Sequence, residues 1–356
     1  MPLPSRRVAL VRLLTIESTC DETAAAVVAE GPTVLASVVA SQYDLHERFG
    51  GVVPEIASRA HVERVLPVID QALREAAITL TELDGVAVAN TPGLSGSLLV
   101  GLSAAKAIAV ATGKPLIAIN HLQAHVYACR MAAGRDVFPC VGLIVSGGHS
   151  NLYRCSGPTD FTPIGGTIDD AAGEAFDKIG SMLGLPFPGG PSVSAAAARG
   201  DRNKHRFPRP MLDDDSRLAF SFSGLKTAVR YRLLELTGGD PSAMPDVGKL
   251  DENTINDIAA GFEEAVVDCL VGKAERALRT SDFRTLCVGG GVAANSRLRE
   301  RLEQSAAEHG YELHIPPMTL CTDNAAMGAI ALERFHAGKF EPLDLDISPG
   351  LERVAK

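Results

Sequence analysis

Two strand–turn–strand hairpins, one near the N-terminus and one in the middle of the chain, constrain the fold more than any other feature of this sequence. The first spans Val8–Ala29 around the polar turn Thr19–Thr23, and the second spans Val141–Cys155 around Gly147–Gly148. Polar or glycine turns between short apolar runs are typical of hairpins. Because each hairpin opens one half of the chain, we predict an internally duplicated α/β protein.

The chain between and after the hairpins alternates between apolar runs and segments with helical periodicity. Its length of 356 residues suits two domains. Further strands are expected at Val34–Ser41, Asp84–Ala89, Pro115–Ile119 and Leu286–Val288. Helices are expected at Ile56–Ala77, Leu98–Ala111, Gly165–Leu185, Asn256–Arg279 and Asn324–His336.

Composition excludes several classes of protein. The net charge of −9 rules out a basic field over the whole molecule, so RNA binding requires a local patch or a partner. We expect no apolar run to approach the ~18 residues of a membrane span, and the first 14 residues contain no cleavable signal pattern. Seven scattered cysteines without a C-x-x-C pair fit a reducing compartment. We therefore expect a cytoplasmic protein.

A histidine pair stands out in the middle of the chain. Asn120 is a predicted N-cap, so His121 and His125 lie four residues apart on one face of the helix that follows, with a stop at Gly134. This spacing fits either two half-buried histidines or a pair of metal ligands. A zinc peptidase of the HExxH type is disfavoured, because Leu122 stands where the general base would be.

Two glycine-rich loops follow predicted strands and precede helices, where backbone N–H groups bind anions. The loop Asn90–Ser97 fits either a structural turn or an anion site. The loop Gly289–Asn295 formally matches G-x-G-x-x-A, with Glu312 at the place of a ribose-binding acid. Too little chain follows this loop to build a doubly wound sheet, so we retain only a glycine loop against which a nucleotide could lie.

Carboxylates mark two further places. Asp169 and Asp170 lie near the start of the predicted helix Gly165–Leu185, where the helix dipole favours acidic residues. Asp177 lies deeper in this helix, where the same explanation covers it poorly. Asp323 either caps the last predicted helix or supplies a third metal ligand.

The most basic stretch is Arg199–Arg209, and Lys226, Arg230 and Arg232 follow it. This stretch is the best candidate for contacts with a phosphate backbone. The alternative is an ordinary solvated loop, since Asp213–Asp215 lies between the two basic groups.

Taken together, these motifs resemble the TsaD/Gcp (YgjD) family of bacterial tRNA N6-adenosine threonylcarbamoyltransferases. The resemblance runs from residue 13 to about residue 340 in family order. The stretches that carry it are Ile16–Thr23, Phe49–Glu55, His121–His125, Leu143–His149, Ile168–Lys178, Phe187–Pro191, Phe220–Lys226, Gly289–Asn295 and Cys321–Asn324. Two departures are Ser150, at the end of the SGGH stretch, and Ser194, where some members carry Asp or Glu at a ribose contact.

The resemblance implies an actin/Hsp70-like (ASKHA) fold of duplicated RNase H-like lobes with a nucleotide cleft between them. The N-terminal lobe would comprise residues 1–118 and 326–356, and the C-terminal lobe residues 119–325. The implied reaction transfers a threonylcarbamoyl group from threonylcarbamoyl-AMP, made by a separate synthase, to adenosine 37 of tRNAs reading codons that begin with A. TsaB-like and TsaE-like proteins are the implied partners.

The resemblance also implies a set of site residues. The metal, Fe(II) first and Zn(II) second, would be held by His121, His125 and Asp323. Contacts with the adenylate are implied for Ile144, Val145, Ser146, Gly147, Gly148, Asp177, Gly190 and Asn295. We add Asp21 and Glu22, from the acidic turn of the first hairpin, as candidates for supporting the phosphate side or the proton transfer. The alternative on the same fold is a Mg-ATP-dependent kinase or ATPase, which has no need of a His-His-Asp site.

Overall fold

The computed structural model of the protein describes residues 10–214, 216–240, 242 and 245–350. These residues form two compact units. The first unit combines the chain up to Tyr43 with Val53–Tyr127 and with the described residues from Asp323 on. The second combines Asp44–Val52 with Ala128–Thr322. The lobe boundaries expected from the sequence, at 118/119 and 325/326, stay a prediction.

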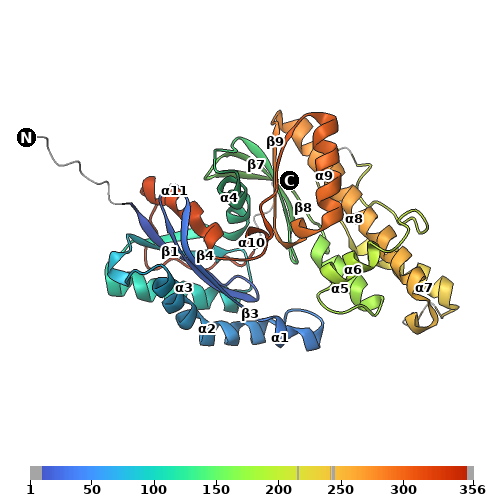
Figure 1. Ribbon diagram of the computed structural model, residues 1–356, viewed down its shortest axis with the longest axis horizontal. Helices are drawn as coiled ribbons and strands as arrows, with labels where there is room; N and C mark the ends of the chain where they lie inside the picture. Colours follow the sequence, from blue (N-terminus) through green and yellow to red (C-terminus); the bar gives the residue numbers. More distant parts are fainter. Residues whose placement is uncertain (1–9, 215, 241, 243–244, 351–356) are drawn as a thin grey trace, which may run out of the picture. The chain divides into compact units, whose positions relative to one another are not determined.

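The first unit is built on a five-stranded mixed sheet with the order β3-β2-β1-β4-β5 (Figure 1). β1 pairs antiparallel with β2 and parallel with β4, while β2–β3 is antiparallel and β4–β5 parallel. The predicted start of β1, Val8, lies outside the described residues. The strands are β1 (Arg12–Glu17), β2 (Glu22–Ala29), β3 (Thr33–Ser41), β4 (Gly85–Thr91) and β5 (Leu116–Asn120).

Helices cover both faces of this sheet. Leu14 and Ile16 of β1 are buried in one apolar core with residues of α2 and α3. Thr15 lies between them and so points to the opposite face, where its hydroxyl donates a 2.6 Å hydrogen bond to the carbonyl of Ala325. The helices of this unit are α2 (Pro54–Glu75), η2 (Leu80–Glu82), α3 (Ser95–Thr112), η5 (Ala326–Ile330) and α11 (Ala331–His336). Two further helices, α1 (Tyr43–His46) and α4 (His121–Ala133), begin in the first unit and end in the second.

Helix α3 contradicts the expectation that no apolar run approaches the length of a membrane span. It has 18 residues and a mean hydropathy of 1.4, so by length and composition alone it is apolar enough to cross a membrane. The run is not obvious in the sequence, because serine and glycine residues and Lys106 interrupt its apolar residues. In the structure 39% of the helix is buried, and Leu102, Ala105 and Ile108 belong to the core of the first unit. The helix thus packs as a core helix of an α/β unit does.

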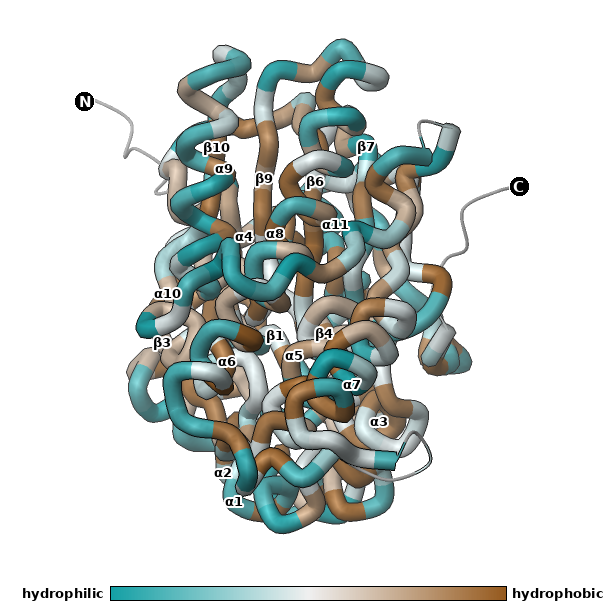
Figure 2. The backbone as a smooth tube through the Cα atoms, turned by 90° about the vertical axis from the view of Figure 1, so that its right-hand side faces the viewer, coloured by the Kyte–Doolittle hydropathy of each residue, from teal (hydrophilic) through white to brown (hydrophobic). Residues whose placement is uncertain are grey.

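The second unit is built on another five-stranded sheet, with the order β10-β9-β6-β7-β8. β6–β7 and β7–β8 are antiparallel, whereas β6–β9 and β9–β10 are parallel. Figure 2 shows β6 and β9 as largely hydrophobic along their length, as expected for central strands buried on both faces. The strands are β6 (Cys140–Val145), β7 (Ser150–Gly157), β8 (Asp160–Gly166), β9 (Thr285–Gly289) and β10 (Glu312–His314).

The two sheets repeat one topology. In each, an antiparallel three-stranded meander is followed by two strands that add in parallel beside its first strand. β1 therefore corresponds to β6, and β5 to β10. The prediction of an internally duplicated α/β fold is confirmed.

One helix prediction in the second unit was wrong at its start. The helix expected at Gly165–Leu185 begins only at Ala172, because Gly165 and Gly166 end strand β8, which the sequence analysis missed. Asp169 thus precedes the helix. Its carboxylate accepts hydrogen bonds from the backbone N–H of Phe222 (2.9 Å) and the hydroxyl of Ser223 (2.6 Å). It therefore stabilises the start of a different helix, α7.

A large apolar core in the second unit lies between its sheet and the central helix α8. Phe176 of α5 and Phe262 of α8 meet there edge to face, with ring centroids 5.2 Å apart. The helical elements of this unit are η1 (Glu47–Phe49), α5 (Ala172–Met182), α6 (Gly189–Ala197), α7 (Ser223–Thr237), η3 (Val247–Lys249), α8 (Glu252–Ser281), η4 (Gly291–Ala294), α9 (Ser296–His309) and α10 (Met318–Cys321).

Candidate functional site

The start of α4 fixes both histidines. Asn120 ends β5, and its side-chain oxygen accepts hydrogen bonds from the backbone N–H of Leu122 (2.9 Å) and Gln123 (3.2 Å), as predicted for an N-cap. The helix therefore begins at His121 and turns His125 to the same side. The two imidazoles are buried, with ring centroids 4.7 Å apart.

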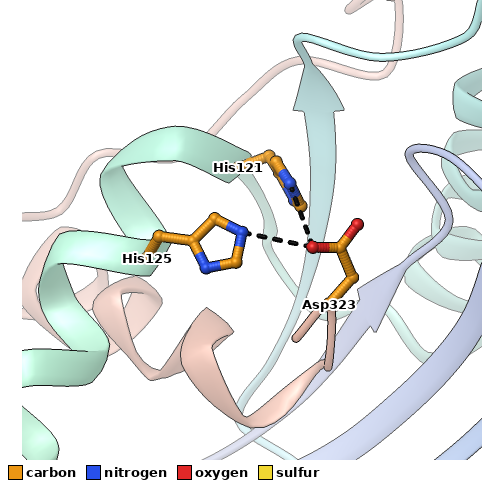
Figure 3. Close-up of side chains that lie close together, drawn as sticks. All are labelled: His121, His125 and Asp323. Atoms are coloured by element: carbon orange, nitrogen blue, oxygen red, sulfur yellow. Dashed lines mark hydrogen bonds and ion pairs between the residues drawn. The ribbon is translucent and has the colours of Figure 1, made fainter. Parts of the chain in front are cut away.

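Asp323 completes a three-residue cluster in the first unit (Figure 3). One of its carboxylate oxygens lies 3.2 Å from His125 Nε2 and 3.6 Å from His121 Nε2. One ligand atom from each residue lies within 4.8 Å of the other two. Because the Asp323 side chain is 19% exposed, one side of the cluster stays accessible. Two imidazole nitrogens and one carboxylate with an open side form a donor set that suits a divalent metal.

Glu17 contacts Nδ1 of His121, the ring nitrogen that does not face Asp323. It was not among the predicted site residues. Its carboxylate lies 3.0 Å from His121 Nδ1 and also accepts a 2.8 Å hydrogen bond from the N–H of Thr19. A carboxylate on the outer nitrogen fixes the ring and makes Nε2 a better ligand. The available signal was an acidic residue at the end of an otherwise apolar strand.

The electrostatics of the cluster favour positive charge. Burial opposes a charge on both imidazoles. At His121 the carboxylates of Glu17 and Asp323 outweigh burial and raise the pKa to about 9, whereas at His125 burial prevails and lowers the pKa. The carboxylates thus draw a proton onto one histidine, and a bound cation would satisfy the same negative charge. The residues present therefore fit a metal.

Asp21 and Glu22 lie in the same electrostatic environment. Burial, together with the charges of Asp323 and Asp21, raises the pKa of Glu22 to about 10. Burial likewise raises the pKa of the neighbouring Cys20 thiol. Since the charge of Asp323 contributes to this shift, a cation bound by Asp323 would lower the pKa of Glu22 again.

Replacing Glu17 by glutamine should lower the affinity for a divalent metal by about 10- to 100-fold, because the amide orients His121 without adding negative charge. Metal titration of the purified protein measures the change. Glu30→Gln is the matched control, since Glu30 pairs with the exposed His336 at 2.7 Å. Equal affinities of the two variants would contradict the role of Glu17.

The turn after β6 exposes two glycines. The N–H of Ser146 donates to the carbonyl of His149 (2.8 Å), while the N–H groups of Gly173 and Glu174 donate to the carbonyls of Ser146 and Gly147 at 3.2 and 3.0 Å. The first turn of helix α5 is thereby hydrogen-bonded to the carbonyl groups of this turn. In the described chain, the N–H groups of the exposed Gly147 and Gly148 donate no hydrogen bond. Such a turn can receive an anion.

The end of β6, just before this turn, can contact a ligand only through its backbone. Ile144 and Val145 are fully buried, so their side chains are not available to a ligand. The carbonyl of Val145 lies against Gly290, which has a φ of +93° and where a Cβ atom would approach that oxygen to 2.4 Å. Only glycine fits there, and the loop after β9 therefore packs directly on the end of β6.

The other predicted substrate residues are held by short hydrogen bonds. Asp177 accepts a 2.7 Å bond from the N–H of Gly189, at the start of α6, beside the partly buried Gly190. Asn295 caps α9 by accepting a 2.8 Å bond from the N–H of Leu298. Its amide nitrogen donates to Ser194 (2.8 Å) and Glu263 (2.7 Å).

Glu263 should make stability depend on pH. Burial raises its pKa above the ordinary value of 4.5, against hydrogen bonds from Asn295 and Ser194 that lower it. The folded state therefore keeps the proton to a higher pH than the unfolded state does, so stability falls as pH rises above about 4.5. Glu263→Gln should remove this decline. Urea unfolding of both proteins over a pH series measures the decline. A difference in unfolding free energy between the two proteins that does not change with pH would contradict the prediction.

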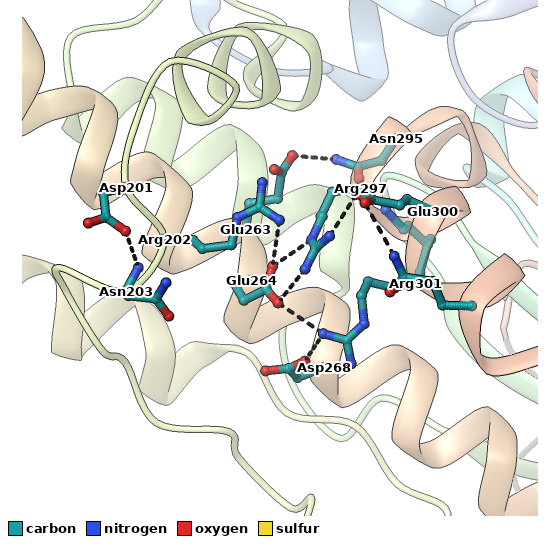
Figure 4. A network of polar contacts seen from close by, with 12 residues as sticks. Asp201, Arg202, Asn203, Glu263, Glu264, Asp268, Asn295, Arg297, Glu300 and Arg301 are labelled. Carbon is teal, nitrogen blue, oxygen red and sulfur yellow. Dashed lines mark hydrogen bonds and ion pairs between the residues drawn. The ribbon is translucent and has the colours of Figure 1, made fainter. Parts of the chain in front are cut away.

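The predicted basic stretch is largely neutralised by carboxylates of α8, and Figure 4 shows Arg202 beside one of them, Glu264. Arg202 lies 3.9 Å from Glu264, Lys204 lies 2.6 Å from Asp257, and Arg209 lies 2.8 Å from Asp268. The stretch is thus neither an unpaired basic patch nor a simple solvated loop.

The repeated sheet topology is that of an α/β protein of the actin/Hsp70-like (ASKHA) fold, with duplicated RNase H-like lobes. Full-length HypF in a phosphate- and nucleotide-bound form is similar with a TM-score of 0.61 at 13% identity, over 93% of this chain and 56% of that chain. Component A of the Acidaminococcus fermentans (R)-2-hydroxyglutaryl-CoA dehydratase gives a TM-score of 0.52 at 15% identity, over 90% and 97%. At these identities the likeness shows the fold alone.

The particular family follows from the sequence. The model of the TsaD family, described as tRNA N6-adenosine threonylcarbamoyltransferase, matches residues 33–330, and the chain belongs to this family. A relative of that name from Rhodopirellula baltica is 53% identical over 96% of this chain and 97% of its own. One from Paracoccus denitrificans is 49% identical over 94% and 92%. The predicted family and enzyme class, a transferase that modifies tRNA, are confirmed.

Proposed function

We propose that the protein transfers the threonylcarbamoyl group from threonylcarbamoyl-AMP to the exocyclic amine of adenosine 37, in tRNAs that read codons beginning with A. The amine nitrogen forms a bond to the carbamoyl carbon and loses a proton. The bond from that carbon to the phosphate oxygen breaks, and AMP leaves with the electron pair. The observation that supports this most directly is the His-His-Asp cluster, in a member of the threonylcarbamoyltransferase family.

We propose that His121, His125 and Asp323 hold one divalent metal, Fe(II) first and Zn(II) second. When bound, such a metal supplies a Lewis acid for the carbamoyl oxygens. Glu17 keeps His121 Nε2 turned toward the ligand position, and the exposed side of Asp323 leaves room for a substrate oxygen.

The remaining site residues would bind and orient the adenylate. The N–H groups of Gly147 and Gly148 would face its phosphate, with Ile144, Val145 and Ser146 holding the turn. Asp177 and Asn295 would contact the nucleoside. Gly190 would let the ligand approach the backbone, since a Cβ atom there would meet nothing within 4 Å. Asp21 and Glu22 would support the phosphate side or the proton transfer.

The partners and the compartment are part of the same proposal. Val62 and Leu66 are 64% and 63% exposed, one turn apart on α2. An exposed apolar pair on a helix supports a protein partner, which we propose to be a TsaB-like subunit, with a TsaE-like protein in the same complex. Seven free cysteines support a cytoplasmic location.

The test is transfer in a reconstituted system. The purified chain, its partner proteins, labelled threonylcarbamoyl-AMP and unmodified tRNA should yield modified adenosine 37 and AMP. Nucleoside analysis of the tRNA reads out the product. Robust Mg-ATP turnover without any dependence on tRNA, and without modified nucleoside, would instead support the kinase or ATPase alternative.

A further inference from the structure

A surface groove lies between the basic stretch and helix α7 of the second unit. Its volume is about 370 Å³. The side chains at its wall include three cations and one carboxylate: Lys204, Arg206, Arg232 and Glu235. His205, Phe207 and Tyr231 supply its rings. The groove therefore combines cationic and aromatic side chains, in a chain whose net charge is −9.

Arg206 is the cation of this groove that is left available. Lys204 lies 2.6 Å from Asp257, and Arg232 lies 2.6 Å from Glu235. Arg206 is exposed, and within the described part of the chain it forms no ion pair. An exposed guanidinium without a carboxylate is suited to a bidentate contact with phosphate.

His205 positions Arg232 at the wall of the groove. It is only 6% exposed, and its Nδ1 accepts a 3.1 Å hydrogen bond from Nε of Arg232, which can only donate. The proton of the neutral ring must therefore sit on Nε2. Among the described residues this buried Nε2 has no partner. The bond to His205 Nδ1 therefore holds the guanidinium of Arg232 at the wall of the groove.

The groove continues toward the predicted substrate residues. A second hollow of about 300 Å³ shares Arg206 with the first and is also lined by Arg202, Glu264 and Asp268. Glu264 is bound by Arg297 at 2.7 Å, and its neighbour Glu263 is bound by Asn295 (Figure 4). The wall of the second hollow is thus hydrogen-bonded to Arg297 of α9, the helix that Asn295 caps.

We propose that this groove binds the tRNA backbone, with one phosphate bound by Arg206 beside Arg232 and an unpaired base stacked on Tyr231. Tyr231 is 56% exposed, as a stacking platform must be. RNA-binding proteins commonly combine phosphate contacts with bases stacked on aromatic side chains. The assignment of the groove to tRNA rests on the function proposed above.

The test uses the full chain with its partner proteins and threonylcarbamoyl-AMP. Arg206→Glu should raise the KM for tRNA about tenfold and leave kcat and the KM for the adenylate unchanged. Arg206→Ala should reduce the slope of log KM against log salt by about 0.7 to 0.9, the value for one phosphate contact. Tyr231→Ala should raise the KM for tRNA at least about fivefold through lost stacking.

Arg279→Glu is the matched control, since Arg279 is an exposed residue of α8 in the same unit and the change in charge is the same. A KM for Arg206→Glu equal to that of Arg279→Glu would overturn the proposal. So would full competition by inorganic phosphate at constant ionic strength, which would indicate a free-anion site. If the wild-type protein transfers nothing, the proposed function fails, while direct tRNA binding by wild type and Arg206→Glu still tests the groove.

Discussion

Replacing Asp323 by alanine should abolish metal binding and lower the rate of threonylcarbamoyl transfer by at least about 100-fold, the effect of losing a few kcal/mol of transition-state stabilisation. Asp323 contributes the one carboxylate of the cluster, so its loss leaves only two imidazoles. The fold should persist, because the Asp323 side chain is partly exposed and belongs to neither apolar core.

Metal content after reconstitution with Fe(II) or Zn(II), and transfer measured on the same samples, check this result. Asp160→Ala, an exposed aspartate of β8, should retain both properties. A thermal unfolding curve of each variant separates loss of metal from loss of fold. An Asp323→Ala protein that binds metal and transfers at the wild-type rate would remove Asp323 from the site.

Replacing Gly173 by alanine should destabilise the protein by about 1–3 kcal/mol, as expected when atoms are forced into a packed interior. A Cβ atom at this position would lie 2.6 Å from the carbonyl oxygen of Ser146 and 2.7 Å from the Cα atom of Gly147. Relief of this overlap requires the turn to move, so the affinity for the adenylate should fall as well. Urea unfolding and ligand titration measure the two effects.

Gly224→Ala is a matched control, because Gly224 is the second residue of α7 as Gly173 is of α5. A Cβ atom on Gly224 would meet nothing within 4 Å. Alanine is the better helix former, so this variant should be unchanged or more stable by up to about 1 kcal/mol. Similar stability of the two variants would mean that the contact between α5 and the turn is loose.

The features that could be predicted from the sequence are those that depend on local patterns. The two hairpins, the N-cap Asn120 and the stop at Gly134, where α4 ends, each depend on residues close together in the chain. The resemblance placed Asp323 beside the histidines, and the structure brings the three residues together. That they bind a metal stays a prediction.

The features that escaped prediction depend on residues far apart in the chain. β8 was missed because Gly165 and Gly166, at its end, resemble a turn, and only pairing with β7 defines the strand. Asp169 stabilises a helix that begins more than fifty residues later. Glu17 is separated from His121 by 104 positions. Single-sequence patterns contain no information about such pairs.

The repeated topology also bears on the origin of the candidate metal centre. His121 and His125 follow the last strand of the first sheet, and Asp323 follows α10, shortly after the last strand of the second sheet. The ligands thus come from corresponding connections of the two repeats, two from one and one from the other. An ancestral chain with a single repeat could not have supplied this set by itself. One repeat of this topology thus holds only part of the candidate donor set, and the complete set requires both repeats.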